Sequence, residues 1–152
     1  IFDVMIHDLD ILLTVVGAEV TSVEAVGVPV LTDRVDIANA RLSFESGCVA
    51  NLTASRISRE RIRKLRFFQQ DAYISVDCAE QEVERWQVAR SKGTTPVIDG
   101  GKLNVPRGEP LERELDDFMT SVLAASSPVV GGVAGRDALA LAHRVAQAMG
   151  TP

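Results

Sequence analysis

The chain has 152 residues, of which 46% are hydrophobic and 24% are charged, with a formal net charge of −5. This length and composition are typical of a globular protein, and residues 1–152 are expected to form a single domain with a real core. The negative charge argues against nucleic-acid binding, and no apolar run approaches the roughly 20 residues of a membrane span. Cys48 and Cys78 lack metal-ligand spacing, so we expect reduced core thiols in the strands of a cytoplasmic protein.

Residues 1–17 read IFDVMIHDLDILLTVVG and predict a short, largely apolar helix that ends at Gly17. Asp3 lies four residues before His7 and Asp10 three residues after it, so we expect all three side chains on one side of the helix. A carboxylate one turn from an imidazole accepts a hydrogen bond from one ring nitrogen, and the other nitrogen can then take a proton. His7 is therefore a candidate general base. The alternative is a structural histidine with solvated acids beside it.

Six stretches after this helix are rich in Val and Thr or alternate between apolar and polar residues, which is typical of strands. The connections between them are short, among them the turn at Ser46-Gly47, and short connections indicate antiparallel pairing. The predicted strands cover residues 19–31, 36–45, 48–55, 62–70, 72–78 and 82–90.

Residues 91–108 carry glycine and proline and little apolar periodicity, so we expect a loop with a short strand near residues 102–105. Apolar residues then recur at helical spacing after Pro110 and again from Arg136 to Met149, which predicts two more helices. The sum is an α+β fold, with an open, mainly antiparallel sheet of about six strands and helices packed on one face.

A run of basic residues follows the third predicted strand: Arg56, Arg59, Arg61, Arg63, Lys64 and Arg66. In an acidic chain such a cluster suits a phosphate or diphosphate, because guanidinium groups bind it through paired hydrogen bonds. The alternative is a solvated strand edge that its charges keep soluble. Arg56, at the end of a predicted strand, is the candidate for a substrate-binding residue.

The order Asp3-x-x-x-His7-Asp8-x-Asp10, followed by an apolar helix and a glycine, resembles the start of the C-terminal domain of the Gfo/Idh/MocA oxidoreductases. Residues 51–58, 63–68 and 71–77 are similar to the sugar-nucleotide branch of that family. The resemblance implies a dihydrodipicolinate-reductase-like C-terminal fold, with His7 as the catalytic base and Asp3 as its orienting partner. It leaves Asp10 either in that network or in contact with substrate.

The resemblance also implies that NAD or NADP binds mainly to an N-terminal Rossmann domain, which we expect to be absent from this chain. No cofactor-binding residue and no metal site are expected here. The implied full-length enzyme is a dehydrogenase that oxidises a hydroxyl of a sugar, polyol or sugar nucleotide similar to UDP-N-acetylglucosamine, and the fragment alone is expected to be inactive. We also expect a homodimer or homotetramer formed through the sheet. The alternative function is a non-catalytic oligomerisation module that uses the open sheet face.

Overall fold

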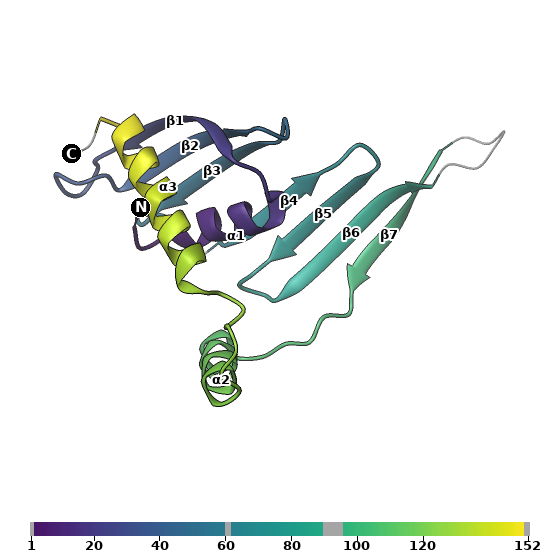
Figure 1. The fold of residues 1–152 in the computed structure, drawn as a ribbon. Coiled ribbons are helices and arrows are strands. Elements are labelled where there is room, and N and C mark those ends of the chain that lie inside the picture. The colour runs from purple at the N-terminus through teal and green to yellow at the C-terminus, as the bar shows by residue number, and fades with distance from the viewer. Residues whose placement is uncertain (1, 60–61, 90–95, 151–152) are drawn as a thin grey trace. The chain divides into compact units, whose positions relative to one another are not determined.

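The computed structural model describes residues 2–59, 62–89 and 96–150. The chain divides into two compact units, which are Ile1–Ser58 together with Asp117–Pro152, and Arg59–Asp116. Helix α2 crosses the boundary between these units. The elements in chain order (Figure 1) are α1 (Ile6–Val16), β1 (Val20–Val28), β2 (Ile37–Phe44), β3 (Val49–Ser55), β4 (Lys64–Phe68), β5 (Ala72–Asp77), β6 (Glu82–Ala89), β7 (Val97–Leu103), α2 (Pro110–Leu123) and α3 (Gly132–Ala148).

In the first unit, helices α1 and α3 pack on one face of a three-stranded antiparallel sheet with the order β1-β2-β3 (Figure 1). The middle strand shows the alternation that the sequence predicts, because residues two apart in a strand share a face. Four alternate residues of β2 are buried beneath the helices: Ala38, Ala40, Leu42 and Phe44.

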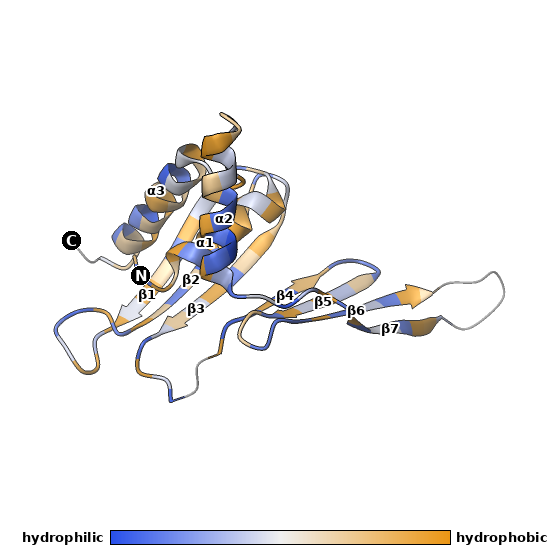
Figure 2. Ribbon diagram, turned by 90° about the horizontal axis from the view of Figure 1, so that it is seen from below, coloured by the Kyte–Doolittle hydropathy of each residue, from blue (hydrophilic) through white to orange (hydrophobic). Residues whose placement is uncertain are grey.

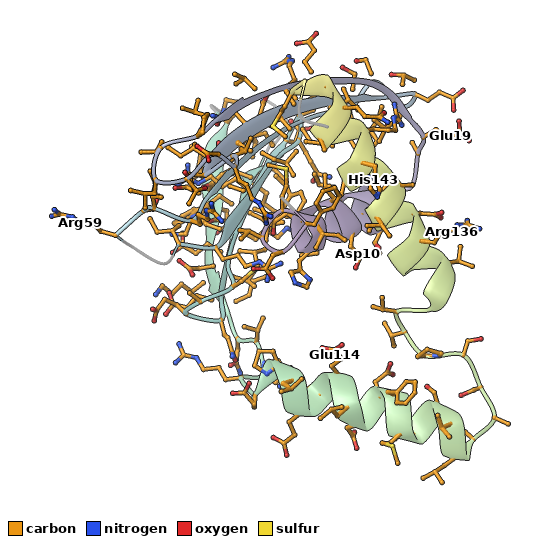
Figure 3. All side chains as sticks on the ribbon, turned by 90° about the vertical axis from the view of Figure 1, so that its left-hand side faces the viewer. Asp10, Glu19, Arg59, Glu114, Arg136 and His143 are labelled. Carbon is orange, nitrogen blue, oxygen red and sulfur yellow. The ribbon has the colours of Figure 1, made fainter. Side chains whose placement is uncertain are left out.

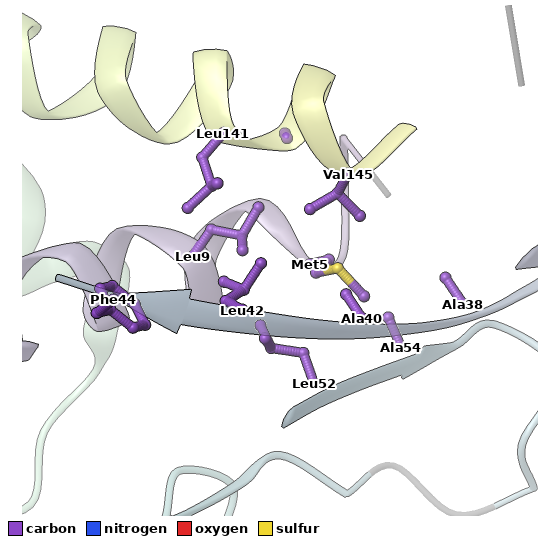
Figure 4. Packing of buried hydrophobic residues seen from close by; sticks show 11 residues of the cluster. Met5, Leu9, Ala38, Ala40, Leu42, Phe44, Leu52, Ala54, Leu141 and Val145 are labelled. Carbon is purple, nitrogen blue, oxygen red and sulfur yellow. The ribbon is translucent and has the colours of Figure 1, made fainter. Parts of the chain in front are cut away.

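The core of this unit lies where the two helices meet the sheet (Figure 4). Met5 and Leu9 approach from the start of α1, Val145 approaches from α3, and Leu42 lies beneath them on β2. All four side chains have an exposed fraction of 0%. Full burial of a side chain of this size stabilises a fold by about 1.5–3 kcal/mol relative to leaving it exposed. This cluster therefore fixes α1 on the sheet.

The face of the first sheet that α1 and α3 leave uncovered carries neutral polar side chains on β2 and β3 beside the exposed Val26, Val28 and Val49. The Arg41 Nη1 donates a hydrogen bond to Asn51 Oδ1 at 3.0 Å, and the Thr53 hydroxyl donates to Asn39 Oδ1 at 2.7 Å. Both pairs join directly opposed positions of β2 and β3. They tie the two strands together on this uncovered face.

The second unit is a four-stranded antiparallel sheet with the order β4-β5-β6-β7. One face has an aliphatic row at opposed positions, formed by Leu65, Val76, Val83 and Leu103, and the other an aromatic row, formed by Phe68, Tyr73 and Trp86. Figure 2 shows apolar segments along these strands. Among the described residues of this unit every side chain is at least partly exposed, so its sheet encloses no core of its own.

The α+β class and the antiparallel pairing are confirmed, and the described residues form the three predicted helices and seven strands divided between two sheets. The seventh strand, β7, occupies part of the segment predicted mainly as a loop, of which residues 90–95 lie outside the described residues. Gly100 and Gly101 have φ of 146° and 152° and interrupt the apolar alternation of β7. Strand β7 is therefore defined by its pairing with β6, and its sequence lacks the apolar alternation that would have predicted a strand.

The placement of the cysteines differs from the prediction. Cys48 is exposed and lies just before β3, so the expectation of a core thiol in a strand is wrong for this residue. The turn at residues 45–47 delays the start of β3 to Val49, which leaves Cys48 in the connection. Cys78 is partly buried and directly follows β5.

Candidate functional site

Helix α1 begins at Ile6, so Asp3 lies in the turn of residues 2–5 that precedes the helix. The Leu9 N–H donates to the Met5 carbonyl at 3.0 Å, which closes the first helical turn. At the other end Gly17 adopts φ 61° and donates its N–H to the Leu13 carbonyl at 3.1 Å. The predicted C-terminal cap is thereby confirmed, and the helix is shorter at its start than the sequence pattern suggested.

The side chain of His7 lies on the solvent side of α1. Met5 and Leu9 both face the core, and a residue midway between them lies about 200° around the helix. His7 and Asp3 are exposed and Asp10, which Figure 3 shows on α1, is half-buried. Among the described residues no hydrogen bond or ion pair joins any two of these three side chains. His7 is thus accessible to a ligand, and the orienting role of Asp3 stays a prediction.

His143, the other histidine of the chain, lies on α3 (Figure 3). Its ring centroid is 4.9 Å from that of Phe2, with an interplanar angle of 54°. A tilted aromatic contact of this kind is a favourable packing arrangement. It holds the segment before α1 against α3, and it gives His143 a structural role.

A small pocket brings two of the predicted site residues together. It has a volume of about 120 Å³. Asp3 and Arg56, which are far apart in the sequence, both line it, whereas His7 and Asp10 do not. The full lining consists of Asp3, Val4, Val35, Asp36, Ala38, Ala54, Ser55 and Arg56. All of these residues belong to the first unit, so the pocket lies between the start of the chain and the ends of β2 and β3.

Asp36 is the buried acid of this pocket, with 3% of its surface exposed. Its Oδ2 accepts hydrogen bonds from the backbone N–H groups of Val30 at 2.8 Å, Leu31 at 2.7 Å and Thr32 at 3.2 Å. The N–H groups of Val30 and Leu31 hold the pKa of Asp36 well below its ordinary value of 3.8, and the Arg56 side chain and Thr32 N–H add to them against the opposing effect of burial. The carboxylate is therefore ionised and organises the β1–β2 loop.

Arg56 is engaged by the same network. Its Nε donates to Asp36 Oδ1, and its Nη2 donates to the Thr32 hydroxyl at 2.7 Å. Its backbone N–H also donates to the Asp36 carbonyl at 3.1 Å, which extends the pairing of β2 with β3 by one residue. The Arg56 side chain is 46% exposed. Two of its guanidinium nitrogens are thus held within the protein, and Nη1 makes no hydrogen bond to another described residue.

The sequence prediction did not include Asp36. The observed register of β2 and β3 pairs Ile37 with Ser55, and one further step along it brings Asp36 opposite Arg56. An acid and an arginine at such opposed positions form an ion pair. A two-residue turn at Ser46-Gly47 would place Asp36 opposite Ile57, so the pair follows only from the longer turn of residues 45–47.

Other residues of the basic run lie in the second unit. The Lys64 ammonium lies 3.0 Å from the Asp77 carboxylate across β4 and β5, and Arg61 lies outside the described residues. In the part of the chain that the structure describes, no group of three or more His, Cys, Asp or Glu side chains is placed to hold a metal ion. No helix among the described residues is long and apolar enough to cross a membrane.

Comparison with known proteins agrees with this architecture. Residues 1–95 match the family model of the GFO/IDH/MocA C-terminal domain. The match covers more than half of the chain. The chain therefore belongs to the GFO/IDH/MocA family.

Individual relatives give a more specific comparison than the family model. The UDP-N-acetylglucosamine 3-dehydrogenase of Acidithiobacillus ferrooxidans is 41% identical in an alignment of 148 positions that covers 95% of this chain and 47% of that protein. A solved structure of that dehydrogenase has a TM-score of 0.84 and 38% identity over 95% of this chain and 45% of its own. Levoglucosan dehydrogenase in complex with NADH and L-sorbose shares the fold, with 16% identity and a TM-score of 0.78 over 95% of this chain and 46% of its own. The chain spans about half the length of these relatives.

Proposed function

We propose that this chain is the substrate-binding and catalytic part of an NAD(P)-dependent dehydrogenase that oxidises a hydroxyl of a sugar nucleotide, with UDP-N-acetylglucosamine and its 3-hydroxyl as the reference substrate. The observation that carries the proposal is the 41% identity to UDP-N-acetylglucosamine 3-dehydrogenase over 95% of the chain. We assign the binding of NAD or NADP mainly to the portion of these relatives that this chain does not span. The bound nicotinamide supplies the hydride acceptor.

In this mechanism His7 is the general base. Its exposed imidazole takes the proton of the substrate hydroxyl while the hydrogen on the same carbon leaves as hydride, so that the carbon becomes a carbonyl. Asp3 and Asp10 lie within one turn on either side of His7 in the sequence and are the candidates to orient it or to bind substrate. Arg56 contributes to substrate binding through the pocket that it shares with Asp3.

The test uses the full-length protein that contains this chain. UDP-N-acetylglucosamine is added together with NAD or NADP, and the absorbance of the reduced nicotinamide is followed. The proposal predicts reduction with a sugar nucleotide and none with the 152-residue chain alone. A full-length protein that reduces neither cofactor with any sugar nucleotide, sugar or polyol would contradict it.

A second candidate function is assembly, in which copies of the chain associate through their sheets as a homodimer or homotetramer. It is supported by the second unit, whose sheet carries apolar rows on both faces and encloses no core among its described residues. Phe68 has an exposed fraction of 78% there. An aromatic side chain exposed on a sheet favours burial against another surface.

Light scattering after size exclusion tests this second function on the chain itself. We expect a mass of at least two chains, and we expect Phe68→Glu to reduce it because a carboxylate cannot be buried unpaired at an apolar contact. Gln69→Glu introduces the same carboxylate at the next position, which is exposed and follows β4, and it is the matched control. A monomeric wild-type chain would exclude assembly through these surfaces.

A further inference from the structure

The charge and the hydrogen-bonding groups of the pocket lined by Asp3, Asp36, Ser55 and Arg56 indicate which part of a substrate can bind there. It contains two carboxylates and one guanidinium, so its formal charge is negative. Asp36 already neutralises Arg56 by a direct ion pair. A diphosphate would therefore meet a compensated arginine and an uncompensated Asp3, and like charges repel at this range.

The pocket offers both donors and acceptors. Ser55 Oγ accepts hydrogen bonds from the Ile57 N–H at 3.3 Å and from the Ser58 hydroxyl at 2.9 Å, so its own hydroxyl hydrogen remains to be donated. Arg56 Nη1 is a further donor, and the exposed Asp3 carboxylate is an acceptor. A hydroxyl or an amide both donates and accepts, whereas a fully ionised phosphate only accepts. This donor set matches an uncharged polar group.

The size of the pocket is also consistent with a small uncharged polar group. With a volume of about 120 Å³, it is a small recess that is partly open to solvent. A recess of this size is suited to a single substituent of a sugar ring.

We propose that this pocket is the subsite for an uncharged hydroxyl or amide substituent of the sugar, and that Asp36 is the positioning residue that orients Arg56 for this contact. The inference rests on the proposed function for the identity of the substrate and specifies which part of it this pocket receives. Asp36 acts through Arg56 and through the backbone at residues 30–32, because its carboxylate joins both. The diphosphate must then bind elsewhere.

The test is a nuclear magnetic resonance titration of the isotope-labelled 152-residue chain, in which N-acetylglucosamine and inorganic phosphate are added in separate experiments. We expect N-acetylglucosamine to shift the Arg56 Nε–H signal and the backbone amides of Asp3 and Ser55, and phosphate at the same concentration to leave them unchanged. Shifts with phosphate but not with the sugar would overturn the proposal and restore a phosphate site at Arg56. The absence of shifts with either compound would also overturn it.

Variants test the positioning role. Asp36→Asn removes the acceptor charge, so we expect faster water exchange of the Arg56 Nε–H and sugar affinity weaker by about tenfold. Thr32→Val leaves the Asp36 carboxylate in place and removes the hydroxyl that partners Nη2 and accepts from the Arg34 N–H, so a smaller loss of affinity is expected. Asp33→Asn makes the same change of charge at an exposed position of the same loop and is expected to match wild type. Equal sugar affinity in Asp36→Asn and Asp33→Asn would exclude a positioning role.

The titration and the dehydrogenase assay can fail independently, so they distinguish the subsite from the proposed function. A full-length dehydrogenase whose isolated chain shows no sugar-dependent shifts would refute this subsite alone. Sugar-dependent shifts in a protein that reduces no nicotinamide would support the subsite and refute the dehydrogenase assignment.

Discussion

Leu9→Ala should strongly destabilise the first unit, because Leu9 anchors the helix that carries His7. Its side chain has an exposed fraction of 0% and belongs to the cluster that includes Leu42 of β2 and Leu141 of α3. The substitution removes roughly three methylene equivalents, worth about 0.8 kcal/mol each in transfer free energy. The cavity left between two helices and a sheet adds to this loss. The expected decrease in the free energy of unfolding is therefore about 3–4 kcal/mol.

Urea unfolding of the chain, followed by far-ultraviolet circular dichroism, measures this loss. The single tryptophan, Trp86, lies in the second unit, so its fluorescence follows the other sheet separately. Leu123→Ala is the matched control, because that leucine is 83% exposed and its truncation should change the free energy by no more than about 0.5 kcal/mol. If Leu9→Ala cost no more than Leu123→Ala, the packing of α1 on the sheet would be refuted.

Two further predictions concern the pairing of strands in the second sheet and the stability of the protein at low pH. Gly100→Ala should disrupt the β6–β7 pairing, because its Cβ would lie 2.1 Å from the Arg85 carbonyl oxygen, whereas a Cβ at Gly101 meets nothing within 4 Å. Trp86 fluorescence should therefore change clearly more in Gly100→Ala than in Gly101→Ala. Equal changes in the two variants would contradict the register of β6 and β7. The pKa of Asp36 is lowered by folding, so its contribution to stability is present above its ordinary value of 3.8 and is lost as the pH falls below that value. Asp36→Asn should therefore show a shallower loss of unfolding free energy with acid than wild type, and a parallel loss in both proteins would count against this linkage.

Local patterns in the sequence were sufficient to predict much of the first unit. The alternation of β2 set its buried face, and the turn signal at Ser46-Gly47 located the β2–β3 hairpin, although the observed turn of residues 45–47 shifts its register by one residue. Gly17 ended α1 where its left-handed conformation predicts. These features depend on the backbone geometry of a few neighbouring residues, which is why they can be read from the chain alone.

The features that the sequence did not reveal depend on the conformation of loops or on pairing at a distance. The partners of Asp36 are backbone N–H groups of the β1–β2 loop, and their direction follows from the loop fold and not from side-chain identity. Asp3 satisfied the four-residue spacing to His7, yet the first helical turn closes only at Met5, so Asp3 lies outside the helix. Strand β7 is held by β6 and carries no alternation of its own.

The most direct test of the account is the turnover of His7→Gln in the full-length protein, measured with UDP-N-acetylglucosamine and the preferred nicotinamide cofactor. We predict a decrease in kcat of about 10²–10⁴-fold with a smaller change in KM, because a general base acts in the transition state. His143→Gln is the matched control, since His143 packs against Phe2 and has no role in the proposed chemistry. A His7→Gln enzyme that retains the kcat of wild type would contradict the central claim that this imidazole removes the hydroxyl proton.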